Sequence, residues 1–328
     1  MNILVTGGAG YIGSHAVKHL TACGHSVWVF DNLVYGHREA VDAERLIEGD
    51  LLDGALVESV LREHQIEAVM HFAAYAYVGE SVTDPGKYYH NNIVGTISLL
   101  EAMRRAGVER IVFSSTCATY GVPNQVPIPE DHPQSPINPY GYTKLVIEQA
   151  LEDYRHAYGW GYAALRYFNA SGAAADGSIG EDHSPETHLI PLILEVALGK
   201  REHISVFGTD YPTPDGSCIR DYIHVDDLAA AHLAALEKLE PGSAIRCNLG
   251  TGTGVSVREV IAACERATGK PIKVVEGPRR EGDPPELVAD PAGALAAIGW
   301  RAEHTDIEAL VASAWRWHKE HPNGYAGG

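Results

Sequence analysis

Tyr140 and Lys144 are the two residues whose types and spacing point most directly to chemistry. They stand four positions apart, so a helix carries both side chains on one face. A free tyrosine loses its proton at about pH 10, and a nearby ammonium group stabilises the phenolate. The pair therefore predicts a general base that removes a hydroxyl proton. The same spacing also occurs on ordinary helices, where the tyrosine packs and the lysine is solvated.

A glycine-rich turn near the N-terminus predicts a dinucleotide site. Gly8, Gly10 and Gly13 satisfy G-x-G-x-x-G, and Gly7 begins an overlapping GxxGxxG. Without Cβ atoms, backbone N–H groups can approach a pyrophosphate at the positive end of the following helix. Asp31 ends the next expected strand, where a carboxylate binds a ribose hydroxyl and repels a 2′-phosphate, so NAD is favoured. The alternative is a structural turn in which Asp31 only caps a loop.

The elements that must position these residues alternate along the chain. Short apolar runs predict strands at 3–5, 27–30, 46–48, 68–72, 111–114 and 163–168, and later at 245–249. Helical periodicity predicts helices at 13–22, 91–106 and 139–158, and later at 189–198, 226–239 and 257–267. This alternation predicts an α/β fold, a Rossmann-type doubly wound parallel sheet with a smaller C-terminal α/β substrate domain. Asp50 follows the third strand and could face the adenine or cap the turn at Leu51-Leu52.

We expect two domains, each built from two separate segments of the chain. Residues 1–168 and about 225–250 are assigned to NAD binding, and about 169–224 with 251–328 to substrate binding. A formal net charge of −18 opposes binding to nucleic acid or to an anionic membrane. The five cysteines form no CxxC pair, and no apolar run reaches membrane-spanning length. We therefore expect a cytoplasmic protein with reduced thiols.

Several segments resemble a known family. Ser114-Ser115-Thr116 closes an expected strand ahead of the Tyr140 motif, and with the glycine turn this set resembles the extended short-chain dehydrogenase/reductase family. Within this family, the chain most resembles the members that epimerise UDP-sugars at C4. This likeness covers nearly the whole chain. Its matching segments begin at Val69, Val78, Tyr88, Tyr167, Arg220 and Arg279. The resemblance implies a UDP-sugar substrate for the second domain.

The resemblance also implies a role for individual residues. The catalytic residues would be Thr116, Tyr140 and Lys144. The NAD site would comprise Gly7, Gly10, Tyr11, Ile12, Gly13, Asp31, Asn32, Asp50, Leu51, Phe72, Ala73, Ala74, Asn91, Ser114, Tyr140, Lys144 and Tyr167. The substrate would contact Thr116, Tyr140, Asn169, Leu189, Phe207, Arg220, Arg280, Asp283 and Leu287. Surface ion pairs with Asp221 and Glu281 are the alternative roles of the two arginines.

The implied reaction is reversible epimerisation of UDP-glucose and UDP-galactose at C4. It passes through a 4-keto sugar, and tightly bound NAD is transiently reduced. Leu287 replaces a tyrosine of several family members, which leaves room for UDP-N-acetylhexosamines. A UDP-pentose (UDP-xylose/UDP-arabinose) 4-epimerase and a non-catalytic NAD-binding protein are the alternatives. A dehydratase is disfavoured because Cys117-Ala118 stands where dehydratases carry Asp-Glu.

Two further expectations concern metals and assembly. His183 and His188 lie five positions apart in a loop, so surface or packing roles are expected and no metal is assigned. The resemblance implies a homodimer through helices such as 91–106 and 139–158, although a monomer remains open.

Overall fold

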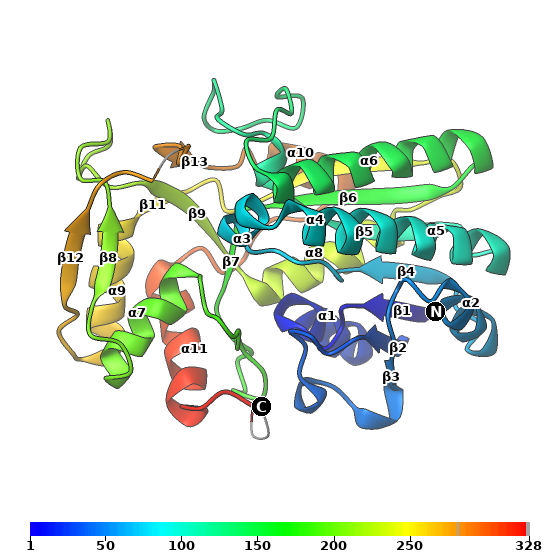
Figure 1. The fold of residues 1–328 in the computed structure, drawn as a ribbon, viewed down its shortest axis with the longest axis horizontal. Helices are drawn as coiled ribbons and strands as arrows, with labels where there is room; N and C mark the ends of the chain where they lie inside the picture. Colours follow the sequence, from blue (N-terminus) through cyan, green and yellow to red (C-terminus); the bar gives the residue numbers. More distant parts are fainter. Residues whose placement is uncertain (281, 326–328) are drawn as a thin grey trace.

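The computed structural model describes residues 1–280 and 282–325. Its centre is a seven-stranded parallel sheet with the order β10-β6-β5-β4-β1-β2-β3 (Figure 1). The strands are β1 (Asn2–Thr6), β2 (Ser26–Asp31), β3 (Leu46–Glu48), β4 (Ala68–His71), β5 (Arg110–Thr116), β6 (Gly161–Tyr167) and β10 (Ala244–Leu249). The first six strands follow the order of a doubly wound nucleotide-binding sheet, which confirms the predicted Rossmann-type fold.

Helices cover both faces of this sheet because alternate strand residues point to opposite sides. Ile3 and Val5 of β1 pack with α1 (Tyr11–Ala22), α8 (Val225–Glu237) and α10 (Ala292–Ile298). Leu4 packs on the other face with α2 (Gly54–Glu63), α5 (Gly95–Ala106) and α6 (Pro139–Tyr158). Both faces are therefore buried, as a parallel sheet requires.

Helix α6 begins where its sequence provides a cap. The Asn138 side chain accepts a hydrogen bond from the Gly141 N–H at 2.8 Å, and Pro139 occupies the first turn. The helix ends at Gly159, which has a φ of 75°. These signals fix the start of the helix beside Tyr140, as the sequence predicted.

The expected helix at 91–106 is correct only in its second part. A π-helical turn, η3 (Tyr89–Val94), precedes α5. Within this turn Asn92 is fully buried, and its side chain bonds both the N–H and the carbonyl oxygen of Tyr75. The wider turn thus ties the helix to the loop after β4, an effect that apolar periodicity does not reveal. Two short helices, α3 (Val78–Thr83) and α4 (Pro85–Tyr88), connect that loop to the turn.

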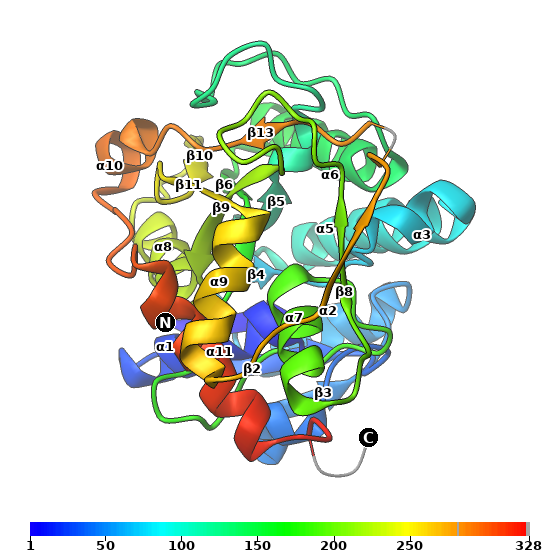
Figure 2. The same cartoon turned by 90° about the vertical axis from the view of Figure 1, so that its left-hand side faces the viewer.

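A second layer lies beside the carboxyl edge of the large sheet, at the left in Figure 1 and toward the viewer in Figure 2. Its strands are β7 (Asn169–Ser171), β8 (Ile204–Phe207), β9 (Ile219–His224), β11 (Gly254–Ser256), β12 (Val274–Gly277) and β13 (Glu286–Leu287). They form a four-stranded sheet around β9 and a two-stranded β8–β12 sheet. Helices α7 (Leu189–Leu198), α9 (Val257–Thr268) and α11 (Ile307–Glu320) share one apolar core with Ile204 and Tyr222. In residues 1–280 and 282–325, no helix is both long and apolar enough to span a bilayer.

Candidate active site

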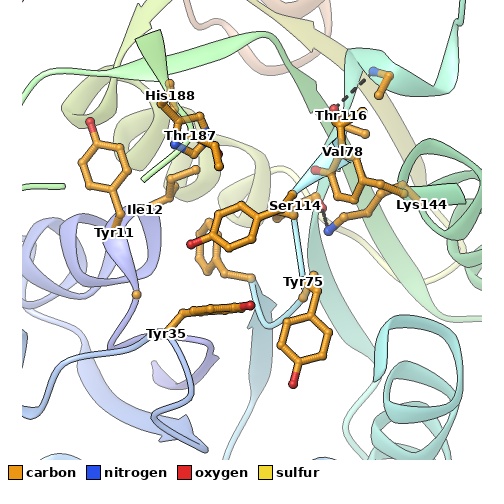
Figure 3. Close-up of a pocket in the computed structure, with 18 of the residues that line it drawn as sticks. Tyr11, Ile12, Tyr35, Tyr75, Val78, Ser114, Thr116, Lys144, Thr187 and His188 are labelled. Atoms are coloured by element: carbon orange, nitrogen blue, oxygen red, sulfur yellow. Dashed lines mark hydrogen bonds between the residues drawn. The ribbon is translucent and has the colours of Figure 1, made fainter. Parts of the chain in front are cut away.

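A cleft of about 780 Å³ opens where the carboxyl ends of β1, β2, β4, β5 and β6 face the second layer (Figure 3). Ligands of open α/β sheets bind at this edge, where the strand order reverses. Residues from both layers line the cleft, including Gly10, Tyr140 and Arg220. The cleft can therefore bring a nucleotide cofactor and a second ligand together.

The glycine turn forms a backbone cradle at one end of the cleft. Gly7 has a φ of 71°, and a Cβ there would lie 2.5 Å from the Ala73 nitrogen. A Cβ at Gly13 would lie 2.1 Å from the Gly7 carbonyl oxygen. Gly10 caps α1 without any side-chain hydrogen bond, so the first N–H groups of the helix are available to an anion. This arrangement fits the pyrophosphate of NAD.

Asp31 holds the turn and also faces the cleft. Its carboxylate accepts hydrogen bonds from the Ala9 N–H at 3.0 Å and the Leu33 N–H at 2.9 Å. Burial raises the pKa of this carboxyl group, and the backbone hydrogen bonds oppose the rise. Asp31 therefore caps the loop, and its place in the cleft wall is also compatible with binding a ribose hydroxyl.

Asp50 caps the turn after β3, one of the two roles that the sequence left open, and its side chain also lines the cleft. One carboxylate oxygen accepts the Leu52 N–H at 2.9 Å, so Asp50 caps the turn after β3. The other accepts a hydrogen bond from Asn32 at 3.3 Å, and both side chains line the cleft. The Asp50–Asn32 pair thus forms the cleft wall beyond β2 and β3.

Tyr140 and Lys144 project from the first turns of α6 into the cleft. The Lys144 Nζ donates a hydrogen bond to the Ser114 carbonyl oxygen at 2.8 Å and lies 5.9 Å from the centre of the Tyr140 ring. Burial lowers the pKa of Lys144 to about 7. The lysine is thus anchored to the end of β5, within electrostatic range of the phenol.

Burial raises the pKa of Tyr140 well above its ordinary value, and a hydrogen bond to the Thr116 side chain opposes this rise. The protein environment by itself therefore favours the protonated phenol. A cationic nicotinamide ring beside Tyr140 would add the positive charge that a phenolate needs. Proton transfer at Tyr140 would therefore depend on the oxidised form of the cofactor.

Arg220 and Arg280 bring positive charge to the opposite end of the cleft. Arg220 forms an ion pair with Asp283 and not with Asp221, so the proposed Arg220–Asp221 surface pair is wrong. Asp221 is fully buried and accepts hydrogen bonds from the Thr251 and Gly252 backbone. Its carboxylate is committed to a loop and does not reach the arginine. The alternative partner of Arg280, Glu281, lies outside the described residues.

The cleft collects nearly all the residues expected at the site. Every expected cofactor residue lines it, as do Thr116, Asn169, Arg220, Arg280, Asp283 and Leu287. Leu189 and Phe207 do not line it: Leu189 starts α7 and packs into the core of the second layer. Phe207 ends β8 with 36% of its surface exposed, and the Arg280 guanidinium carbon lies 4.1 Å from its ring centre. Phe207 is thus connected to the cleft through its contact with Arg280, which does line the cleft.

Three tyrosines on the cleft wall were not anticipated. The Tyr35 ring packs edge-on against those of Tyr75 and Tyr77, with centroid distances of 5.4 and 5.1 Å. Tyr75 and Tyr77 follow β4 directly, and Tyr35 follows β2. The sequence could have placed these tyrosines in the cleft wall, because they follow strands β2 and β4 and parallel strands end at the cleft edge.

A cluster of two glutamates and two histidines lies at the cleft edge. We call Glu181, His183, Glu186 and His188 the Glu/His cluster; one ligand atom from each lies within 4.8 Å of all the others. Burial would lower the pKa values of the histidines, but the carboxylates raise them to about 9 for His183 and about 10 for His188. The two histidines therefore have charged partners, whereas the sequence predicted surface or packing roles. The repeated Glu-x-His pattern was the signal that could have found the cluster.

Comparisons with known proteins agree with this geometry. Residues 3–250 match the NAD dependent epimerase/dehydratase family. A UDP-glucose 4-epimerase of Halalkalibacterium halodurans is 53% identical over 99% of this chain and 98% of its own length. The crystal structure of a Brucella ovis UDP-glucose 4-epimerase in complex with NAD is 52% identical, with a TM-score of 0.94 over 96% of this chain and 98% of that chain. The UDP-Glc/GlcNAc 4-epimerase of Campylobacter jejuni is 41% identical, with a TM-score of 0.86 over 97% and 99% of the two chains.

Proposed function

Because this chain belongs to the NAD dependent epimerase/dehydratase family, we propose that it interconverts UDP-glucose and UDP-galactose by inverting C4 of the sugar. The observation that carries the proposal is one cleft with three features in order: the glycine cradle, Tyr140 with Thr116 and Lys144, and the Arg220–Arg280 end. A cofactor site, an acid–base site and an anion site are what this reaction needs. NAD supplies hydride acceptance and return at C4 when it is bound.

Tyr140 is the proposed acid–base residue. Its phenolate would take the proton of the sugar 4-hydroxyl, directly or through Thr116, and become the phenol, while the C4 hydrogen would leave with its electron pair to bound NAD. The product of this half-reaction is a 4-keto sugar. In the second half the hydride returns to the opposite face of C4 and Tyr140 gives the proton back, so no net oxidation occurs.

The other residues orient the reacting groups. The Lys144 Nζ is anchored by its hydrogen bond to the Ser114 carbonyl oxygen. When Lys144 is protonated, its positive charge stabilises a phenolate on Tyr140. Arg220 and Arg280 bind the substrate diphosphate, for which their multiple N–H donors are suited. The Arg220–Asp283 ion pair holds one of these donors in place. The sugar can then rotate and present its opposite face while its diphosphate stays bound.

Leu287 sets the proposed substrate range. It lines the cleft from β13, whose partner strand β9 carries Arg220. A leucine leaves more room than a tyrosine next to the 2-substituent, so UDP-N-acetylhexosamines are also proposed substrates. The similarity to the UDP-Glc/GlcNAc 4-epimerase of Campylobacter jejuni supports this extension. The comparisons do not favour the UDP-pentose alternative, and the intact Tyr140–Lys144 pair argues against a non-catalytic role.

Leu287→Tyr tests the substrate range. The variant is expected to lose at least tenfold in kcat/KM for UDP-N-acetylglucosamine, about 1.4 kcal/mol, and to keep its rate with UDP-galactose. The two rates are compared in the same preparation. Equal rates of wild type and variant with the N-acetyl substrate would refute the steric explanation.

The assembly, the location and the domain division are further parts of the proposal. Helix α6 exposes Tyr142 and Tyr158, and Val94, just before α5, is also exposed, which supports a homodimer through this side of the molecule. A cytoplasmic location is supported by five cysteines that are all free thiols. We assign the large sheet, which includes β10, to NAD, and the second layer to the UDP-sugar.

Product analysis tests the reaction itself. The purified protein is incubated with UDP-galactose without added NAD, and the products are followed by NMR. UDP-glucose is expected, because the cofactor is retained by the cradle. If no UDP-glucose forms even after NAD is supplied, the proposed hexose epimerisation is wrong.

A further inference from the structure

The Glu/His cluster carries a feature that the epimerase chemistry does not use. Glu181 and Glu186 keep only 5% and 7% of their side chains exposed, so two carboxylates are taken out of water side by side. Buried carboxylates of like charge need positive charge between them. Among the described residues, His183 and His188 place ring nitrogens within 4 Å of these carboxylates.

The distances within the cluster match a metal-ligand set. The His188 Nδ1 lies 2.8 Å from the Glu181 Oε1 and 3.1 Å from the Glu186 Oε1. The His183 Nδ1 lies 3.3 Å from the Glu181 Oε1 and 3.6 Å from the Glu186 Oε2. Ligand atoms at zinc bond lengths in a tetrahedron are separated by about 3.3 Å. The four histidine–glutamate separations lie around this value, with Glu186 reached through Oε2 from His183 and through Oε1 from His188.

The orientation of His183 is a second, independent observation. Its Nδ1 is buried and makes no hydrogen bond, although two carboxylates are near. A protonated imidazole serving only as an ion-pair partner would be expected to donate a hydrogen bond to one of them. A nitrogen directed at the space between two carboxylates is instead the geometry of a metal ligand.

The surrounding structure keeps the ligand atoms in place. The Tyr11 and Tyr77 rings pack edge-on against the His183 ring, with centroid distances of 6.3 and 6.1 Å. The Glu186 Oε1 accepts the N–H groups of Thr187 and His188 at 2.6 and 2.8 Å. His188 also occupies the N-cap position of α7, so its backbone is held at the start of a helix. Such support is what a defined coordination geometry needs.

We propose that Glu181, His183, Glu186 and His188 form a binding site for one divalent cation of the zinc type. Two carboxylates and two neutral imidazoles balance the charge of the ion, and nitrogen and oxygen donors suit zinc. Four protein ligands leave no open position on a tetrahedral ion, so the site is structural. It fastens the loop between β7 and α7 against Tyr11 at the start of α1, next to the cofactor cradle.

Metal content tests the proposal directly. The full-length protein with its bound NAD is treated with chelator, given a small excess of Zn²⁺ or Co²⁺ at pH 8, and desalted. About one ion per chain is expected by elemental analysis, and Co²⁺ should give the intense visible absorption of tetrahedral coordination. The thermal midpoint should rise with Zn²⁺, since the ion binds only the folded chain.

Variants separate the site from adventitious binding. His183→Gln and Glu186→Gln should each weaken Zn²⁺ binding at least tenfold, a factor typical of a damaged metal site. His156→Gln is the matched control, because it removes an exposed His–Glu pair (3.2 Å from Glu152) on the surface of α6. Retention of Zn²⁺ by both cluster variants, or no ion in the wild type, would overturn the proposal and leave an ion-pair network only. NAD content is measured in the same samples to show that each variant is folded, and none of these readouts depends on epimerase activity.

Discussion

At the scale of single residues, the active site depends on how burial changes the two groups of the Tyr140–Lys144 pair. Burial raises the pKa of Tyr140, which favours its protonated phenol, and lowers that of Lys144 to about 7, so the lysine changes its charge near neutral pH. Proton transfer therefore needs charge from the cofactor. We therefore expect Tyr140 to act as a base when the oxidised cofactor is bound.

Removing the Tyr140 hydroxyl tests this assignment. Tyr140→Phe should lower kcat by at least ~10²-fold, because the acid–base group is gone while the ring still packs. The NAD content of the purified variant should equal that of wild type. Tyr142→Phe is the matched control, since Tyr142 lies in the same helical turn with 50% of its surface exposed. Near-normal turnover of Tyr140→Phe would exclude this tyrosine as the base.

The glycine cradle offers a second test at this scale. Gly7→Ala places a Cβ 2.5 Å from the Ala73 nitrogen and should reduce the NAD content of the purified protein. Gly24→Ala is the control, because Gly24 also has a positive φ (84°) but nothing within 4 Å of its Cβ position. Both variants should lose about 1 kcal/mol of stability to backbone strain, and Gly7→Ala should lose more because its Cβ also meets the Ala73 backbone. Only Gly7→Ala should lose the cofactor, and equal NAD content in the two variants would contradict the cradle.

At the scale of elements, the start of α6 decides where the acid–base residues lie. The Asn138 cap sets the first turn, and Tyr140 is the second residue of the helix. Lys144 follows one turn later and reaches the end of β5. The distance between base and lysine is therefore a property of one helix and one strand end.

Loss of the cap should weaken this element. Asn138→Ala should reduce the free energy of unfolding by about 1 kcal/mol, because the Gly141 N–H loses its acceptor. Asn138→Asp keeps an acceptor at the same place and should remain close to wild type. Chemical denaturation of the three proteins measures the effect. If Asn138→Asp is destabilised as much as Asn138→Ala, the lost hydrogen bond is not the cause of the destabilisation.

At the scale of the whole molecule, buried histidines limit stability in acid. Within the central sheet, His71 lies between the Thr6 and Thr96 hydroxyls, at 2.7 and 2.8 Å. Burial, with a smaller contribution from Lys144, lowers the pKa of His71 from 6.5 to about 3. Unfolding therefore takes up a proton as pH falls below 6.5, and the stability present above that pH is lost on the way to pH 3.

His71→Gln should flatten this acid dependence. One proton fewer is taken up on unfolding, so the slope of unfolding free energy against pH near pH 5 should fall by up to about 1.4 kcal/mol per pH unit. His156→Gln removes an exposed histidine and should leave the slope unchanged. Denaturant unfolding at several pH values provides the comparison. An unchanged slope in His71→Gln would mean that this histidine does not control acid stability.

The sequence by itself determined the elements and the motifs of the nucleotide-binding part. Apolar periodicity, the cap at Asn138 and the glycine turn act over a few residues, so they are visible in the order of amino acids. The predicted strands and the helix at 189–198 correspond to those observed. The π-helical turn at Tyr89–Val94 was missed because its cause, the buried Asn92–Tyr75 contact, joins residues from different elements.

Only the tertiary structure decided which charged groups meet. Arg220 pairs with Asp283, 63 positions away, and not with its neighbour Asp221, because adjacent residues of β9 point to opposite sides. The Glu/His cluster forms because its loop folds back against Tyr11 and Tyr77. Contacts of this kind depend on how the two layers pack at the cleft. Local sequence carries no record of that packing, since it arises from the burial of many apolar side chains at once.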